Sequence, residues 1–149
     1  MLSKKIVHKH FLLVIEESIS RIQKVLIELK DSGANETKST AGDKHETALA
    51  MIQIEQANMR SQLENMLQKK LIMQQLDPTI VTAEVRNGSL VFTDKNILYI
   101  SVAVGKQTMA GKEIIAISPQ SPMGLSLMGS VVGSSVMVNQ QHFKVIQLF

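Results

Sequence analysis

The sequence of 149 residues contains no cysteine and no tryptophan, and its aromatic residues are four phenylalanines and one tyrosine. The absence of cysteine excludes disulfides, thiolate nucleophiles and cysteine metal sites, and it is compatible with a reducing compartment. So few aromatic side chains disfavour the stacking surfaces on which single-stranded nucleic acids bind. The apolar run Phe11–Ile15 is too short for a signal peptide or a membrane span, and Glu16 and Glu17 follow it at once. We therefore expect a cytoplasmic protein with no membrane partner.

Proline and glycine are scarce in the first half of the chain. All three prolines and six of the eight glycines lie after residue 77. Because both residues interrupt helices, their scarcity predicts two long helices in residues 1–77. Residues 1–77 hold 11 Lys/Arg and 10 Asp/Glu, whereas residues 78–149 hold 5 and 3. Interspersed charges of both signs indicate a solvent-exposed coiled coil, and not the basic face of a sequence-specific DNA-binding protein.

An apolar seam runs along each predicted helix. In the first helix, about residues 3–31, the seam residues follow spacings of three and four: Leu12, Ile15, Ile19, Ile22, Leu26 and Leu29. In the second, about residues 42–76, they are Leu49, Ile52, Met59, Leu63, Met66 and Met73, with Gln56 and Lys70 in the polar gaps. This heptad pattern is typical of a coiled coil. We expect an antiparallel hairpin in which Leu29 meets the turn around Leu49.

The polar stretch between these helices is the predicted tip of the hairpin, at about residues 32–46. The tip is where a function that must reach a distant place would lie. Thr40 and Asp43 fit a capping box at the start of the second helix, so a capping role alone would explain Asp43. The acids at the tip are Glu36, Asp43 and Glu46.

Residues 78–149 predict short strands and one short helix. An Asn87-Gly88 turn precedes runs of β-branched and aromatic residues. The expected strands are residues 90–93, 97–103, 113–117, 135–138 and 142–148. Ser121 as N-cap, Pro122 at the first helical position and Gly129 after the end predict a helix at residues 122–128. The predicted fold class is therefore α+β, with an N-terminal antiparallel coiled-coil hairpin (1–77) and a small β-sheet domain carrying one short helix (78–149).

The segment from Ser118 to Gly133 has the most specific pattern in the chain. It reads SPQSPMGLSLMGSVVG and resembles the pattern SP-x-G-x-x-L-x-G-x-x-V-G in the C-terminal domain of bacterial Gre transcript-cleavage factors. The match continues at Asn87–Ser89, Tyr99–Ser101, Val136–Val138 and Phe143–Leu148. An antiparallel coiled coil of about this length forms the other half of that family, so the resemblance covers the whole chain.

The resemblance implies an FKBP-like domain for residues 78–149. Members of the family dock this domain at the rim of the RNA polymerase secondary channel and insert the coiled coil. An Asp and a Glu at their tip then help to hold a second Mg²⁺ for hydrolysis of backtracked RNA. By this resemblance the chain is an accessory transcription elongation factor that binds RNA polymerase, contacts nascent RNA only indirectly and is not itself an enzyme. Prolyl isomerase activity is not expected, because this half has too few aromatic residues to line the pocket.

The tip departs from the family's pattern, which reads like G-D-L-x-E-N-A-E-Y-H. When the two are aligned on His45, the family's acids correspond to Thr37 and Thr40, whose hydroxyls carry no charge to recruit a cation. Two versions of the function remain open. In one, Glu36, Asp43 and Glu46 supply carboxylates to the polymerase active site, with Mg²⁺ shared through Glu36 and Asp43. In the other, the tip only occupies the channel. Neither version involves a tightly bound cofactor.

The turn Ser121-Pro122-Met123-Gly124 is the candidate docking site for the polymerase, since a methionine beside a rigid turn would offer an apolar knob. The alternative is that these four residues only shape the turn and the helix start. For the whole protein, the alternative function is a coiled-coil interaction or chaperone-like module that does not bind polymerase.

Overall fold

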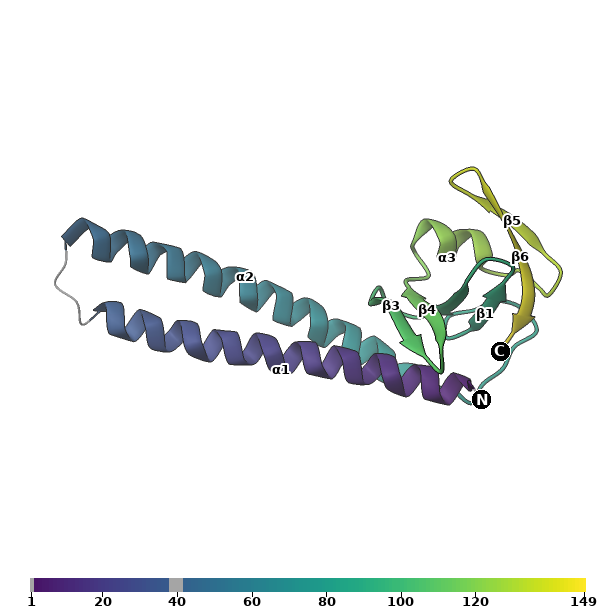
Figure 1. Ribbon diagram of the computed structural model, residues 1–149, viewed down its shortest axis with the longest axis horizontal. Helices are drawn as coiled ribbons and strands as arrows, with labels where there is room; N and C mark the ends of the chain where they lie inside the picture. Colours follow the sequence, from purple (N-terminus) through teal and green to yellow (C-terminus); the bar gives the residue numbers. More distant parts are fainter. Residues whose placement is uncertain (1, 38–41) are drawn as a thin grey trace. The chain divides into compact units, whose positions relative to one another are not determined.

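The computed structural model describes residues 2–37 and 42–149, with the side chains of residues 2–35 and 45–149 (Figure 1). Two long helices, α1 (Lys4–Thr37) and α2 (Gly42–Gln75), precede a six-stranded sheet. Its strands are β1 (Leu90–Thr93), β2 (Ile97–Ile100), β3 (Gly105–Met109), β4 (Lys112–Ile117), β5 (Ser135–Val138) and β6 (Gln141–Leu148). One short helix, α3 (Pro122–Leu127), lies between β4 and β5 in the chain. The predicted α+β class, with a helical hairpin before a small sheet domain, is confirmed.

The chain forms two compact units. Residues 15–68 form the hairpin unit, and the residues up to 14 together with residues 69–149 form the sheet unit. The first turns of α1 and the last turns of α2 therefore belong to the sheet unit. The predicted domain boundary at residue 77 and the FKBP-like topology stay predictions.

The hairpin unit carries the predicted seam. Ile15, Ile19 and Ile22 are buried on α1. All seam positions of α2 in this unit are half-buried, and one of them is the polar Gln56. They are Leu49, Ile52, Gln56, Met59, Leu63 and Met66. The positions on the opposite face of α2 are exposed, among them Met51 and Ile54. The seam thus follows the heptad pattern even where a glutamine interrupts it.

The first helix extends closer to the tip than the sequence pattern predicts, whereas α2 begins at Gly42, where the pattern places its start. α1 continues through Gly33 to Thr37, because a glycine inside a helix costs only about 1 kcal/mol and does not end it. A Cβ on Gly33 would lie 3.7 Å from Cγ2 of Ile52, so these two residues face each other. With that register, helical geometry puts Leu29 opposite the turn of Gln56, and not opposite Leu49 as expected. The predicted N-cap, Thr40, lies outside the described residues.

The sheet has the strand order β3-β4-β2-β1-β6-β5, in which β2 and β4 are parallel and the other neighbours antiparallel. The sequence pattern did not predict β3, because Gly105–Met109 has no alternation of apolar residues. Its hairpin with β4 turns at Ala110 and Gly111, which both have positive φ (50° and 76°). The expected strand 97–103 ends earlier, at Ile100.

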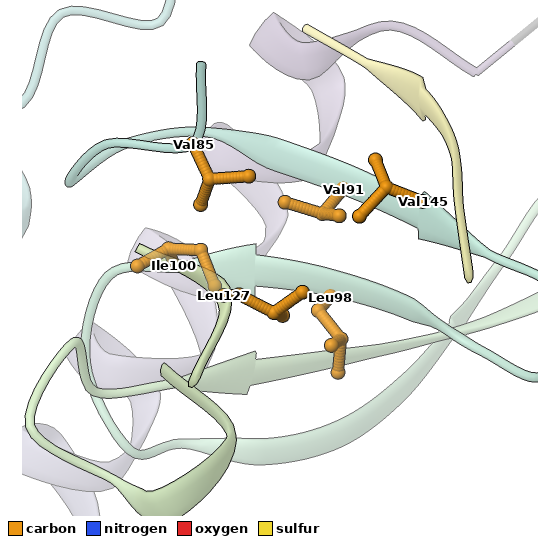
Figure 2. Packing of buried hydrophobic residues seen from close by; sticks show 6 residues of the cluster. All are labelled: Val85, Val91, Leu98, Ile100, Leu127 and Val145. Carbon is orange, nitrogen blue, oxygen red and sulfur yellow. The ribbon is translucent and has the colours of Figure 1, made fainter. Parts of the chain in front are cut away.

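The core of the sheet unit lies on both faces of the sheet. On one face, buried side chains from the strands meet Leu127 of α3 (Figure 2); the cluster is Val85, Val91, Leu98, Ile100, Leu127 and Val145. Tyr99 lies between two members of this cluster in β2, so its side chain points to the other face. There it stacks on Phe11 of α1, with ring centroids 6.2 Å apart and an interplanar angle of 24°. The first turns of α1 and the helix α3 therefore cover opposite faces.

Candidate functional site

The turn before α3 is held by a local network of hydrogen bonds. Ser121 is the N-cap, as predicted, and its Oγ accepts a hydrogen bond from the Gly124 amide at 3.1 Å. The same hydroxyl donates to the Ser118 carbonyl at 2.6 Å, and the Ser121 amide donates to that carbonyl at 3.1 Å. The Gln120 amide donates to Ser118 Oγ at 3.1 Å. The serines of the motif therefore fix the turn from both ends.

Gly124 is required by a close approach of backbone to backbone. A Cβ at this position would lie 2.3 Å from the carbonyl oxygen of Ser118 and 2.9 Å from Cα of Pro119. No side chain fits at such distances, so the motif needs glycine here. Pro122 occupies the first helical position, where its missing amide hydrogen costs no helical hydrogen bond. Ser121 and Gly124 thus have structural roles in the turn, and a part in docking stays a prediction.

Met123 does not form the exposed apolar knob that the sequence suggested. Its side chain is half-buried and packs against the buried core cluster. The exposed apolar side chains of α3 and its C-cap are instead Leu125 (65% exposed) and Met128 (40%). We call Pro122, Leu125 and Met128 the α3 surface. The i, i+3 spacing of Leu125 and Met128, out of phase with buried Leu127, was the available sequence signal for this surface.

The acids of the tip fall mostly outside the described side chains. The backbones of Glu36 and Asp43 are helical, in α1 and α2 respectively, but their side chains lie outside the described residues. Glu46 is described, and its side chain is exposed on α2. Among the residues whose side chains are described, no group of three or more His, Asp or Glu residues is placed to hold a metal ion. The roles of these three acids stay predictions.

A buried polar contact that the sequence did not reveal joins the start of α1 to the sheet. Nδ1 of His8 lies 2.7 Å from the hydroxyl of Tyr99, and both residues are buried. Burial lowers the pKa of His8, with the positive charge of Lys4 acting in the same direction and Asp77 opposing it. Burial also raises the pKa of Tyr99. A neutral imidazole bonded to a neutral phenol therefore sits in the core, and no local sequence pattern pairs residues 91 positions apart.

A cavity of about 490 Å³ lies beside the turn, at the carboxyl ends of the parallel strands β2 and β4. Amide and hydroxyl side chains dominate its polar lining, among them Asn87, Ser101 and Gln120. Lys69 is the charged residue of the lining, and its ammonium donates to the carbonyl of Ala103 at 2.8 Å. The cavity can exchange hydrogen bonds with a polar segment, but it has no arrangement for acid–base or nucleophilic chemistry.

Within the described parts of the chain, no helix combines the length and the apolarity that crossing a bilayer requires.

No protein-family profile and no curated protein matches this sequence. Among solved structures, the GreA factor homolog Gfh1 of Thermus thermophilus is 16% identical, with a TM-score of 0.37 over 93% of this chain and 94% of that chain. Another structure of the transcription factor Gfh1 is 17% identical, with a TM-score of 0.37 over 92% of each chain. Gfh1 of Thermus aquaticus is 18% identical, with a TM-score of 0.32 over 87% of this chain and 92% of that chain. Values this low assign no function to this chain.

Proposed function

We propose that the protein is a Gre-like accessory factor that binds RNA polymerase through the secondary channel and modulates transcript elongation. The observation that supports this is the segment Ser118–Gly133. Several residues that its pattern fixes have a defined local role: Ser121 caps α3, Gly124 admits the Ser118 carbonyl, and Gly129 has a positive φ of 80°. Such a pattern is difficult to obtain by chance, and it follows a helical hairpin as it does in the Gre family.

The α3 surface and the helical hairpin would have different roles in this function. The α3 surface offers two exposed apolar side chains beside a rigid turn, which is the kind of site that anchors a protein–protein contact. The hairpin is long enough to extend into a channel, because each of its 34-residue helices is about 50 Å long. In this proposal the α3 surface contacts the polymerase, and the tip enters the channel.

The tip carboxylates decide whether such a factor promotes RNA cleavage. Carboxylate oxygen is a preferred ligand of Mg²⁺, so the donor chemistry of Glu36, Asp43 and Glu46 fits that metal, and Glu46 is accessible. Mg²⁺ shared with the polymerase would supply an activated water for hydrolysis. The chain's own contribution would be to present these carboxylates at the active site. Without that contribution the tip would only block or reshape the channel.

Binding is tested by co-purification of the full chain with core RNA polymerase, followed by competition with an authentic transcript-cleavage factor. We expect complex formation, displacement by the competitor, and at least about tenfold weaker binding for Leu125→Glu. Val81→Glu is the matched control, because Val81 is 61% exposed and lies outside the α3 surface. Absence of binding, or binding that the competitor leaves untouched, would refute the proposal.

Cleavage is tested on backtracked elongation complexes with the wild-type chain and with Glu36→Ala and Asp43→Ala. Loss of RNA shortening in either variant assigns the carboxylate a role in cleavage. Shortening that is unchanged in both variants excludes these two residues. If the wild-type chain slows elongation without shortening RNA, the tip only occupies the channel.

A second candidate function is an interaction or chaperone-like module without a polymerase partner. Met51 and Ile54 favour it, because they lie one turn apart on the outer face of α2 and are 66% and 63% exposed. Binding of the chain to a chemically unfolded client protein, lost in a Met51→Glu/Ile54→Glu variant and accompanied by no polymerase binding, would support this function instead.

A further inference from the structure

The two edges of the sheet differ in how they are protected. β3 and β5 are the outermost strands, and in the described chain β5 pairs with β6 alone. An exposed strand edge presents unpaired amide and carbonyl groups, and proteins usually guard it with lysine, proline or a bulge. β3 carries Lys106, which forms a salt bridge of 3.5 Å with Glu113 on β4. Residues 131–141, which include β5, contain no charged residue and no proline.

Exposed apolar side chains accompany the unguarded edge. Met137 of β5 is 58% exposed, and Val132, just before the strand, is also 58% exposed. Ile146 of the neighbouring strand β6 is 50% exposed. The other face of β5 is already occupied, because Val136 packs against the buried core. On the outer face of β5, an added strand would therefore meet Ser135 and the apolar Met137, which lie two positions apart on that face.

The charges around this edge are mainly positive. Lys144 on β6 is exposed and lies opposite Ser135, while His142 lies opposite Met137. Lys95 donates to the His142 carbonyl and lies 4.8 Å from the ring centroid of Phe143. The nearby carboxylate, Asp94, accepts a hydrogen bond from the Lys144 amide at 2.9 Å. Lys144 itself makes no salt bridge within the described chain, so its ammonium is available to a partner.

The pairing of Ser135 with Lys144 tells where the partner's charge should be. A strand added to β5 would be the second neighbour of β6, roughly 10 Å away from it. Ser135 lies between the two strands, and its side chain is small enough for the Lys144 side chain to extend across it. A glutamate on the added strand and the long side chain of Lys144 would then meet above Ser135. We propose that the free edge of β5 binds an extended, acidic segment of another protein by strand addition, with a glutamate beside Ser135 and an apolar residue, two positions away on the same face, beside Met137. This inference does not depend on the polymerase proposal.

The test uses the full chain and a defined probe, an acetylated and amidated peptide of about eight residues in which valine and glutamate alternate along one face and threonine occupies the other (Val-Thr-Glu-Thr-Val-Thr-Glu-Thr). We expect the peptide to slow amide hydrogen exchange at Ser135–Val138 by about tenfold or more at saturation and to leave Gly105–Met109 unchanged. A peptide with N-methyl groups at alternate residues should not bind, because it cannot pair with the strand. Equal binding of the methylated peptide, or equal protection of β3, would overturn the proposal.

The contribution of the Lys144 charge to peptide binding is tested by reversing that charge. Lys144→Glu should weaken binding of the glutamate peptide by about tenfold and strengthen binding of the equivalent lysine peptide. Lys106→Glu, which changes the same charge at the other edge, is the matched control and should leave both affinities unchanged. If β5 amides instead become protected as the protein concentration rises without peptide, and the chain dimerises, the occupant is a second copy and the proposal is wrong.

Discussion

The hairpin unit and the sheet unit use apolar residues in opposite ways. Among the described side chains of residues 15–68, only Ile15, Ile19 and Ile22 are buried, and all three lie on α1. In the sheet unit, residues from β1, β2, β4, β6 and α3 are almost completely buried. When two helices pack together, only one narrow stripe of each helix is removed from water. A sheet covered by helices on both faces buries side chains on both of those faces.

The difference explains where stability and function can be placed. Burial of apolar area is the main favourable contribution to folding, so the sheet unit should supply most of the free energy of unfolding. The hairpin unit buries little, and its helices gain stability from being continuous with the turns of α1 and α2 that belong to the sheet unit. Its exposed surface is correspondingly free to change without loss of the fold.

Truncation of Phe11 should give the largest effect. Phe11 is fully buried and stacks on Tyr99, so Phe11→Ala leaves a cavity and should lower the free energy of unfolding by about 3–5 kcal/mol. Urea denaturation followed by circular dichroism measures the change. Leu26→Ala, at a half-buried seam position of the hairpin unit, is the comparison and should cost clearly less. Equal losses would contradict the contrast between the two units.

Substitution of Gly124 should give the next largest effect. In Gly124→Ala the new Cβ overlaps the Ser118 carbonyl, so the turn must move, at a cost of about 1–3 kcal/mol. The same denaturation experiment measures this loss. Ser126→Ala on the exposed side of α3 tests whether the loss is specific, since it should change stability very little.

Acidification should weaken the sheet unit through His8. Its pKa in the folded protein is lowered, chiefly by burial, so the unfolded chain takes up a proton at a pH where the folded chain does not. Stability should therefore be complete above about pH 6.5 and fall as the pH drops below it. Urea midpoints at pH 7.5 and 5.5 measure the trend. A His8→Gln variant should lose this part of the pH dependence, and a variant with an undiminished slope would rule out His8 as its source.

Substitution of Gly33 should give the smallest effect and the opposite sign from that of Gly124. Gly33 is inside α1, and an added Cβ would meet Ile52 Cγ2 at 3.7 Å, an ordinary van der Waals distance. Gly33→Ala should therefore raise the local stability of the hairpin by about 0.5–1 kcal/mol. Amide hydrogen exchange of residues near position 33 measures it. Faster exchange in the variant would show that the helix does not pack as described.

Periodic features could be predicted from the sequence, and the structure confirms them: the heptad seam, most strands, and the cap of α3 at Ser121. Features that depend on contacts between distant residues could not. β3 forms because Gly105–Met109 pairs with β4, although its own residues show no strand pattern. Met123 was expected outside, but the core beneath α3 has room for it. The pairing of His8 with Tyr99 arises only after α1 has packed on the sheet.

The candidate site was predictable in part for the same reason. Ser121, Pro122 and Gly124 of the Ser118–Gly133 segment have local roles, which a pattern can encode. The sequence pattern does not fix Leu125 and Met128, and their exposure in the structure identifies them as surface residues. Of the tip acids, Glu46 has a described side chain, which is exposed on α2, and Glu36 and Asp43 are known as side chains from the sequence alone.

Photo-crosslinking from the tip tests the central claim most directly. A photoreactive amino acid is placed at Glu46, which is exposed on α2, or at Val81 in the sheet unit as a reference, and the full chain is mixed with core RNA polymerase. The account predicts that position 46 crosslinks to the subunits that form the polymerase active site, and that an authentic cleavage factor abolishes the crosslink. Polymerase crosslinks that never arise from position 46, or that the competitor does not affect, would contradict it.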